Sequence, residues 1–287
     1  MSEIAEIPEI PEIPKIPKIA ELPKIPELPV LLHVYRAHTF GYADFIRAIP
    51  PIKNLAETHG YIYQITIEHP IKQFLDISSP SYEIIPSSIK TISGDEDFKY
   101  LERELQKEPK KSITIDANYS NWFEVISFRT VQDYIKPSSE LSSFIQQTLK
   151  TISLVPAKFI VFHIRCGDSD FKEVESTRVL NFLKQVREKI AIIRFQRMPI
   201  LVLSSSQPLL EKCRTIPNIY TSGFKPIHVA HDVDNLQALK ETLAEFYIMG
   251  LSRKIYSMSG LGFGTGISGF SHKAAKVFNI PYIHFDN

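Results

Sequence analysis

Three short segments of this sequence combine residue types that could do chemistry. In the first, FHIRCGD at residues 162–168, an apolar run delivers His163 and Arg165 two positions apart. Residues two apart point to the same face of a strand, so both side chains should leave its end together. An arginine there can bind a phosphate through two parallel hydrogen bonds and stabilise charge that develops on it. An ordinary strand-to-loop junction with a structural Arg–Asp pair is the alternative.

Glycines mark the second segment, SMSGLGFGTGISGFS at residues 257–271, which holds five of the chain's 11 glycines. A helix that follows such a loop presents free backbone N–H groups towards an anion. Hydroxyl groups could add further donors, from Ser259, Thr265, Ser268 and Ser271. The pattern favours phosphate binding, although it is neither a Walker A motif nor the G-x-G-x-x-G opening of the dinucleotide fold. A flexible surface loop is the alternative.

The third segment, HTFGYADFIR at residues 38–47, is a weaker signal. Gly41 lies in an expected strand-to-helix turn, where the backbone could pass close to a ligand. Asp44 and Arg47 are three apart, which places them on one face of the helix that follows. A salt-bridged helix start accounts for the same residues without any ligand.

Alternating strands and helices must position these segments. Hydrophobic periodicity predicts strands at 30–35, 61–67, 112–116, 158–164, 200–203, 254–258 and 282–285. It predicts helices at 43–58, 138–150, 176–192, 207–214, 234–250 and 271–278. Pro50 and Pro51 should break or kink the first helix, and residues 76–110 carry no firm prediction. This α/β alternation predicts two open, mostly parallel sheets with helices on both faces, which bind ligands at the carboxyl ends of their strands.

Composition limits the classes of function. A length of 287 residues suits two domains. The 33 basic and 32 acidic residues nearly balance, which argues against a general nucleic-acid binder. Two cysteines, Cys166 and Cys213, cannot form a disulfide framework, so we expect a reducing, cytoplasmic location. His228 and His231 lack a third ligand for zinc, and the longest apolar runs are too short to span a membrane.

The N-terminal tail, residues 1–29, has a period of three. Proline, a charged residue and an aliphatic residue alternate there with few exceptions, as in a polyproline II helix with three ridges. Its prolines forbid an α-helix or a central strand. The tail is predicted to be either a semi-rigid spacer or an arm that docks on a partner or on the body. The remaining body has 30 basic and 26 acidic residues, a balance that suits an anionic ligand.

Together the three segments resemble the fucosyltransferases that use GDP-fucose. HIRCGD at 163–168 is similar to their H-x-R-x-G-D element, in which a second Arg often stands where this chain has Cys166. GYADFIRA at 41–48 resembles their N-terminal glycine-rich turn and helix. Residues 243–275 resemble their late motif, in which an acidic helix precedes a strand ending in Ser and then a loop of the S-G-F-S type. The order and spacing match over about residues 30–287.

The resemblance implies a GT-B architecture, with two Rossmann-like domains facing across a cleft and the Pro-rich tail outside them. Residues 30–152 would form the acceptor-side domain, and residues 153–287 would form the domain that binds the sugar nucleotide. The segment 76–111, with Tyr119 and Trp122 nearby, is where we expect acceptor contacts, because aromatic faces stack on sugars. Trp122 could equally be a core residue.

The resemblance also implies roles for single residues. Arg165 would grip the pyrophosphate and neutralise the leaving GDP, His163 would lie beside the nucleotide, and Gly41 would close over the phosphates. The nucleotide-binding set is completed by Ser259, Ser268, Gly269, Phe270 and Ser271. Inverting transfer in such enzymes needs no metal, because the Arg and a helix N-terminus stabilise the departing diphosphate. We therefore expect no metal and no cofactor beyond the donor substrate, GDP-fucose.

Two departures bear on the donor. Relatives often carry an acid that binds guanine where this chain has serines at 204–206, and Cys166 replaces a cation. Another nucleotide sugar could therefore be the donor, or Asp232 or Asp234 could compensate. For the general base, Asp44 is the first candidate and Asp168 and His38 are alternatives; Asp44 could also serve only as a helix cap.

The expected function is that of a metal-independent inverting glycosyltransferase, which moves fucose from GDP-fucose to a glycan or other hydroxyl acceptor. A non-catalytic nucleotide- or glycan-binding relative of the same fold is the main alternative. A scaffold whose Pro-rich tail recruits a partner is another.

Overall fold

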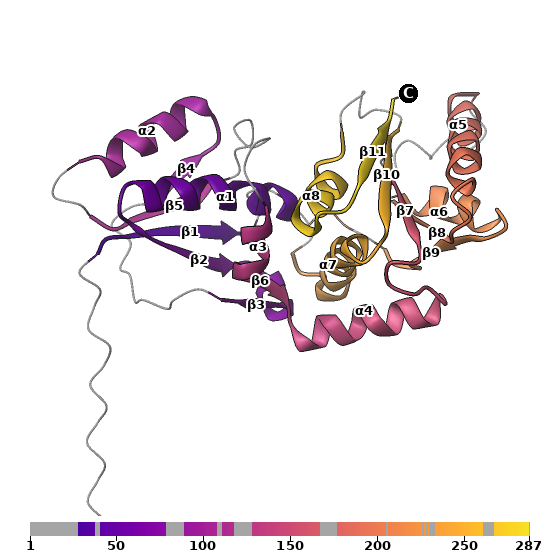
Figure 1. Cartoon of the computed structure of the whole chain (residues 1–287), viewed down its shortest axis with the longest axis horizontal. Coiled ribbons are helices and arrows are strands. Elements are labelled where there is room, and N and C mark those ends of the chain that lie inside the picture. Colours follow the sequence, from indigo (N-terminus) through magenta and orange to yellow (C-terminus); the bar gives the residue numbers. More distant parts are fainter. Residues whose placement is uncertain are drawn as a thin grey trace, which may run out of the picture.

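A computed structural model describes residues 28–37, 41–78, 89–107, 111–117, 128–166, 177–204, 206–225, 227, 229, 233–260 and 267–286. Within these residues, two parallel sheets lie side by side along the longest axis of the molecule (Figure 1). No helix in the described ranges has both the length and the apolar character needed to cross a membrane. Residues 1–27 of the predicted tail, the acceptor-side aromatics Tyr119 and Trp122, and the histidines at 38, 228 and 231 lie outside these ranges.

The first sheet has the strand order β2-β1-β5-β4, with every neighbouring pair parallel. Its strands are β1 (Val30–Arg36), β2 (Ile62–Glu68), β4 (Ile89–Ile92) and β5 (Ile113–Ala117). Helix α1 (Tyr42–Thr58) connects β1 to β2, and α2 (Asp95–Leu105) connects β4 to β5. Figure 1 shows the arrowheads of β1 and β2 pointing towards the second sheet, so their carboxyl ends face that half of the molecule.

Alternation along β1 separates the two faces of the first sheet. His33 and Tyr35 point to the face that α1 covers, where both rings lie within 5 Å of the Phe45 ring. The register pairs Leu32 with Gln64 and Arg36 with Glu68, so the even-numbered residues share the opposite face. This opposite face is the more polar one.

The connection between the sheets contains a short antiparallel pair. Strand β3 (Leu75–Ile77) follows the 3₁₀ turn η1 (Pro70–Phe74) and pairs with β6 (Ile135–Pro137), which follows α3 (Arg129–Tyr134). Helix α4 (Ser139–Thr151) then begins at Ser138, whose hydroxyl accepts a hydrogen bond from the Leu141 N–H. A serine N-cap of this kind satisfies one of the free donors of the first turn.

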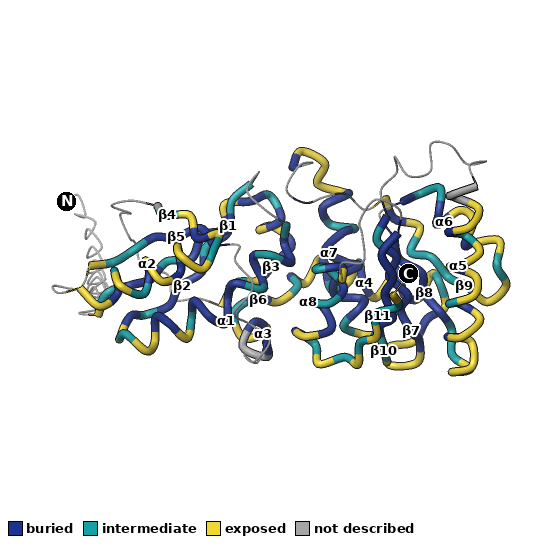
Figure 2. The backbone as a smooth tube through the Cα atoms, turned by 90° about the horizontal axis from the view of Figure 1, so that it is seen from above, coloured by how far each residue is buried: buried dark blue, intermediate teal, exposed yellow. Residues whose placement is uncertain are grey.

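The second sheet has the order β11-β10-β7-β8-β9, again with every pair parallel. Its strands are β7 (Ile160–Arg165), β8 (Ile200–Ser204), β9 (Ile219–Thr221), β10 (Lys254–Ser259) and β11 (Tyr282–Phe285). Its helices are α5 (Thr177–Arg194), α6 (Gln207–Arg214), α7 (Leu236–Gly250) and α8 (Gly269–Phe278). Figure 2 shows the central strands as buried and the outer side of α5 as exposed.

Successive side chains of β7 also point alternately to the two faces of the second sheet. Ile160, Phe162 and Ile164 belong to the core beneath α5 and α6. Val161 belongs to the core that includes α7 and α8. His163 and Arg165 follow Val161 at intervals of two residues, so their side chains point to the same face, the one covered by α7 and α8.

The parallel sheets and most predicted elements are confirmed, but the expected break in the first helix is wrong. Helix α1 continues through Pro50 and Pro51 to Thr58. Each proline removes one backbone donor. Both prolines are buried within an apolar helix face, and packing of that face outweighs the lost bonds. The sequence did not predict η1, β3, β4, α2, α3, β6 or β9, which are short or lie in polar stretches.

Candidate active site

A cavity of about 330 Å³ lies where the carboxyl end of β7 meets the first turns of α1 and α8. Segments that are far apart in the sequence line it. They are Gly41–Asp44, His163, Arg165, Ile227, Val229, Thr242, Glu245 and residues 268–270. Seven of the residues predicted from the sequence therefore lie in one place: Gly41, Asp44, His163, Arg165, Ser268, Gly269 and Phe270.

The end of β7 supplies a ring and a cation to this cavity. The His163 ring is buried, and its centroid lies 6.1 Å from that of Phe270. Burial, together with the charge of Arg165, lowers the pKa of His163 to about 3, so the imidazole is neutral at pH 7. Its Nδ1 atom has no hydrogen-bond partner among the described residues. The end of β7 thus offers one guanidinium and one neutral ring to a ligand.

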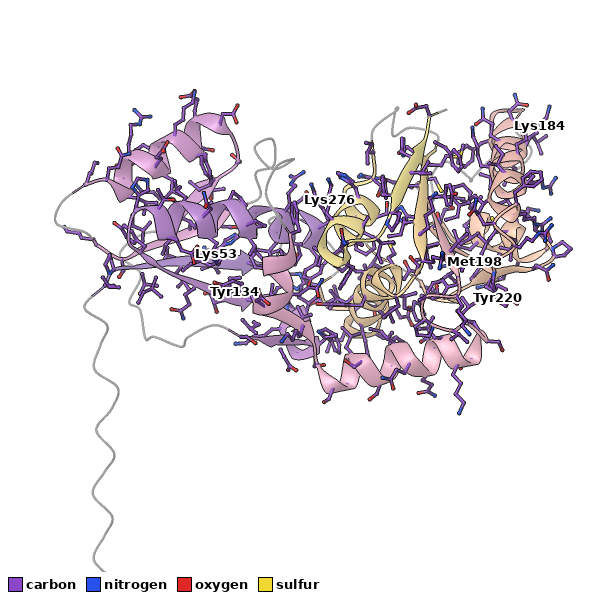
Figure 3. The ribbon with its side chains drawn as sticks, in the orientation of Figure 1. Lys53, Tyr134, Lys184, Met198, Tyr220 and Lys276 are labelled. Atoms are coloured by element: carbon purple, nitrogen blue, oxygen red, sulfur yellow. The ribbon has the colours of Figure 1, made fainter. Side chains whose placement is uncertain are left out.

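Helix α8 begins at the cavity. Ser268 is its N-cap residue, and its buried hydroxyl has no partner in the described part of the chain. A Cβ atom added at Gly269 would meet nothing within 4 Å, so the first turn faces open space. The N–H groups of a first helical turn have no acceptor within the helix and carry partial positive charge. Lys276 lies in the last turn of α8, where a cation balances the other end of the dipole (Figure 3).

The first turn of α1 closes the cavity from the other sheet. Gly41 is the N-cap residue, and its carbonyl accepts hydrogen bonds from the N–H groups of Asp44 and Phe45. Its φ of −72° is open to any residue, so its backbone angles do not require glycine. The Asp44 carboxylate lies 3.1 Å from the Arg47 guanidinium. The salt-bridged helix start that the spacing allowed is therefore present, at the edge of the cavity.

Glu245 is a cavity residue that the sequence reading did not select. Its side chain is buried on α7, and its Oε1 accepts a hydrogen bond of 2.9 Å from the Ser222 hydroxyl. Burial raises the pKa of Glu245 to about 8, with Glu241 adding to the rise and Ser222 opposing it. The sequence feature that could have identified Glu245 is that it is the single acid within the apolar stretch at 243–249. A buried acid with so high a pKa in a cavity marks a candidate functional residue.

Two predicted binding residues lie next to the cavity without lining it. Ser259 is buried on β10 opposite Arg165, and Ser271 is buried in the first turn of α8. Because α8 begins at Gly269 and not at Ser271, Ser271 is already part of the helix. Cys166 is buried against the α5 core, and its Sγ lies 3.3 Å from the Ser204 hydroxyl. Cys166 thus belongs to the opposite face of β7 from Arg165.

Other predicted groups cannot be placed. Asp168 and Asp232 lie outside the described residues, as does Thr265 in the glycine-rich segment. Across the described ranges, no group of three or more His, Cys, Asp or Glu side chains is placed to hold a metal ion. The chemistry that the placed residues offer is anion binding by Arg165 and α8, beside a buried acid and a neutral imidazole.

Comparison with known proteins identifies the architecture. No protein-family model and no curated protein matches the sequence at a significant level. Solved structures do match: the alpha-1,6-fucosyltransferase NodZ soaked with GDP-fucose has a TM-score of 0.58 at 15% identity, covering 91% of this chain and 96% of NodZ. A mutant of FUT1 from Arabidopsis thaliana, in complex with GDP, has a TM-score of 0.58 at 10% identity, covering 90% of this chain and 71% of FUT1. The chain has a fucosyltransferase fold.

The match to solved fucosyltransferase structures extends over most of the chain. NodZ from Bradyrhizobium matches over 91% of this chain at 15% identity, with a TM-score of 0.58. The resemblance drawn from three sequence segments is therefore matched by the fold.

Proposed function

We propose that this protein is a glycosyltransferase that moves fucose from GDP-fucose to a hydroxyl acceptor, without a metal. The observation that carries the proposal is the meeting of Arg165 with the N-terminus of α8 in one cavity of a fucosyltransferase fold. We further propose the GT-B division into residues 30–152 and 153–287, with the donor held mainly by the second part.

The diphosphate of the donor would bind between Arg165 and the first turn of α8. The guanidinium can donate two parallel hydrogen bonds to phosphate oxygens. The open first turn at Gly269 and the Ser268 hydroxyl offer further donors. As the sugar–phosphate bond breaks, negative charge grows on the leaving GDP, and these fixed donors stabilise it. Ser259 and Ser271, buried behind the cavity, would support this turn and are not proposed to touch phosphate.

Glu245 is the acid that we propose for recognition of the base. Guanine presents the donors N1–H and N2–H₂ on one edge, and one carboxylate can accept from both. The serines at 204–206 were the expected counterpart, but the Ser204 hydroxyl already interacts with Cys166 and with the Ser206 N–H. Glu245 lies in the cavity, where Ser222 orients its carboxyl group.

Transfer itself needs a base for the acceptor hydroxyl, and we propose Asp44 for that role. The acceptor oxygen would attack the anomeric carbon while GDP leaves with the bonding electrons and Asp44 takes the acceptor proton. His163, which is neutral, and Phe270 would pack beside the nucleotide, and Gly41 would cover it from the first sheet.

The ion pair between Asp44 and Arg47 supports a second candidate, a binding protein of the same fold without turnover. The Asp44 carboxylate is already engaged by the Arg47 guanidinium at 3.1 Å, so less of it is available to take a proton from an acceptor hydroxyl. Under this alternative the cavity would hold the nucleotide and release it unchanged.

A nucleotide panel tests the proposal. Thermal unfolding of the full chain should shift upwards with GDP and GDP-fucose, and much less with ADP, UDP or CMP. Equal shifts with all nucleotides, or none with any, would overturn the choice of donor. Release of GDP from GDP-fucose in the presence of a glycan mixture should then be measured. Binding of GDP-fucose with no GDP release would leave the binding protein as the function.

For its location we propose the cytoplasm, because Cys166 and Cys213 are both buried thiols, as in proteins of reducing compartments. We also retain the proposal that the tail at residues 1–29 contacts a partner.

A further inference from the structure

The polar face of the first sheet carries three buried side-chain atoms without a hydrogen-bond partner among the described residues. They are Oε1 of Gln64, Oγ1 of Thr114 and Oδ1 of Asp116. Leu32 pairs with both Gln64 and Thr114, so these two lie on one face in one row across the sheet. Asp116 follows Thr114 by two residues and therefore shares that face. Buried polar atoms are nearly always paired, so three unpaired atoms on one face indicate partners that the described residues do not supply.

An ion pair lies at the rim of the same face. The Arg36 guanidinium donates a hydrogen bond of 3.0 Å to the Glu68 carboxylate, at the carboxyl ends of β1 and β2. The two side chains are 30% and 55% exposed, so solvent reaches this pair, whereas Asp116 is only 3% exposed. Arg36 and Glu68 both act electrostatically on Asp116, which places the buried carboxyl beside the rim.

This rim lies at the ligand-binding edge of the sheet. In open parallel sheets, ligands bind beyond the carboxyl ends of the strands. Arg36 is the last residue of β1, and the turn that follows leads to Gly41 and the cavity. The rim and the donor cavity are thus joined by one short connection.

We propose that Arg36, Glu68 and Asp116 form a subsite for the hydroxyl groups of a neutral sugar, the acceptor of the reaction. This inference rests on the proposed function. It differs from the sequence-based expectation, which placed acceptor contacts at 76–111.

The charges at the rim select the class of ligand. Two carboxyl groups accept hydrogen bonds from hydroxyl groups, and the guanidinium donates to hydroxyl or ring oxygens. With two acids and one base, the subsite has no surplus positive charge for a carboxylated or sulfated sugar. Burial raises the pKa of Asp116 to about 6, against the effect of Arg36, so it is mostly ionised at pH 7 and can accept from a hydroxyl. A neutral glycan with adjacent hydroxyl groups fits these requirements.

The test uses the full-length chain saturated with GDP, applied to an array of neutral and uronic-acid oligosaccharides. The wild type should retain neutral glycans in preference to acidic ones. Asp116→Asn and Glu68→Gln should each weaken retention by about tenfold, the effect of losing one hydrogen bond to a charged group. Glu211→Gln is the matched control, because Glu211 is exposed on α6 beside the second sheet. If Asp116→Asn does not fold, the exposed Glu68→Gln still carries the test.

The outcomes separate this inference from the proposed function. If GDP does not stabilise the wild type, the proposed function fails. If GDP stabilises all four proteins equally but no neutral glycan is retained, the subsite is wrong. It is equally wrong if acidic glycans are preferred, or if the two rim variants retain glycans as well as Glu211→Gln does.

Discussion

The hydroxyl of Tyr42 lies 3.3 Å from the hydroxyl of Tyr247. Tyr42 belongs to the first turn of α1 and Tyr247 to α7, so this hydrogen bond joins the two halves of the chain directly beside the cavity. The Tyr42 ring also meets Phe246 edge to face, at a centroid distance of 5.3 Å. Both hydroxyl groups are buried, and burial raises the pKa of each above its usual value. The wall of the cavity is therefore fixed by contacts between the halves as well as within them.

Replacing Arg165 tests the diphosphate site. Arg165→Ala should weaken GDP binding by about 100-fold, the scale for truncating one member of a desolvated charge pair. Arg165→Lys should weaken it by about tenfold, because an ammonium keeps the charge but loses the bidentate fork. Isothermal titration calorimetry measures both, with the exposed Arg253→Ala as control. Equal affinity in Arg165→Ala and the wild type would remove Arg165 from the site.

Glu245 should make donor binding depend on pH. With a pKa of about 8 in the free protein, its carboxyl group is protonated at pH 7 and must lose the proton to accept from guanine. Affinity for GDP-fucose should therefore rise about tenfold per pH unit up to pH 8 and level off above it. Glu245→Gln should lower the affinity at pH 8 and abolish this dependence. A wild-type affinity that is flat from pH 6 to 8 would contradict the assignment.

The same carboxyl group affects stability with a definite sign. Its pKa in the folded state exceeds the usual 4.5, so the folded state holds the proton more tightly than the unfolded state does. The stabilisation is complete below pH 4.5 and is lost as pH rises towards 8. Relative to the wild type, Glu245→Gln should therefore gain stability between pH 6 and 9 in urea unfolding.

Gly269→Ala should separate binding from folding. The added methyl group meets nothing within 4 Å, so the free energy of unfolding should change by less than about 0.5 kcal/mol. The same methyl group enters the space at the first turn of α8 where we place the diphosphate, and GDP affinity should fall at least about tenfold. Unchanged GDP affinity, measured by calorimetry, would place the diphosphate elsewhere.

Gly250→Ala should do the reverse. A Cβ atom at Gly250 would lie 2.4 Å from ring atoms of Phe278, so α7 and α8 would have to move apart. We expect a loss of about 1–3 kcal/mol in the free energy of unfolding, as for other overpacked sites. Adding Phe278→Leu should restore part of that loss. Gly269→Ala is the control, because it adds the same methyl group in open space; equal stability of the two variants would contradict the packing argument.

Acid should destabilise the protein through His33. This residue is fully buried between Tyr63 and the Ala117 carbonyl, and burial lowers its pKa to about 4. The unfolded state takes up the proton first, so stability is complete above pH 6.5 and falls by about 1.4 kcal/mol per pH unit down to pH 4. His33→Gln should show a shallower fall in that range in chemical denaturation, and the same response above pH 7. An equally steep fall in both proteins would assign the effect to other groups.

Periodicity was enough to predict the elements that build the sheets, because β1, β7 and β8 are apolar runs of strand length. Periodicity did not predict helix α2, because this helix is mostly polar and buries only Phe98, Leu101 and Leu105. Strand β9 has three residues, too few for any pattern. The persistence of α1 through two prolines depends on packing that a local rule does not include.

Some residues of the candidate site could likewise be predicted from the sequence, and others could not. His163 and Arg165 were predictable because a spacing of two at a strand end fixes a shared face. Glu245 was not, because nothing local distinguishes a buried acid that lines a cavity from one paired within a helix. The roles of Asp44 and Arg165 stay predictions until binding is measured.

The two faces of β7 have a consequence for how this sequence can change over time. Adding or deleting one residue just before Ile160 would move every side chain of β7 to the other face of the sheet. Phe162 and Ile164 would then point into the cavity, and the Arg165 charge would be buried under α5. Adding or deleting two residues would return each side chain to its present face. The strand therefore tolerates exchange of one aliphatic side chain for another. The number of residues between the preceding turn and the strand can change only by two, because a change of one exchanges the two faces. Length variation in descendants of this chain should collect in loops away from that turn.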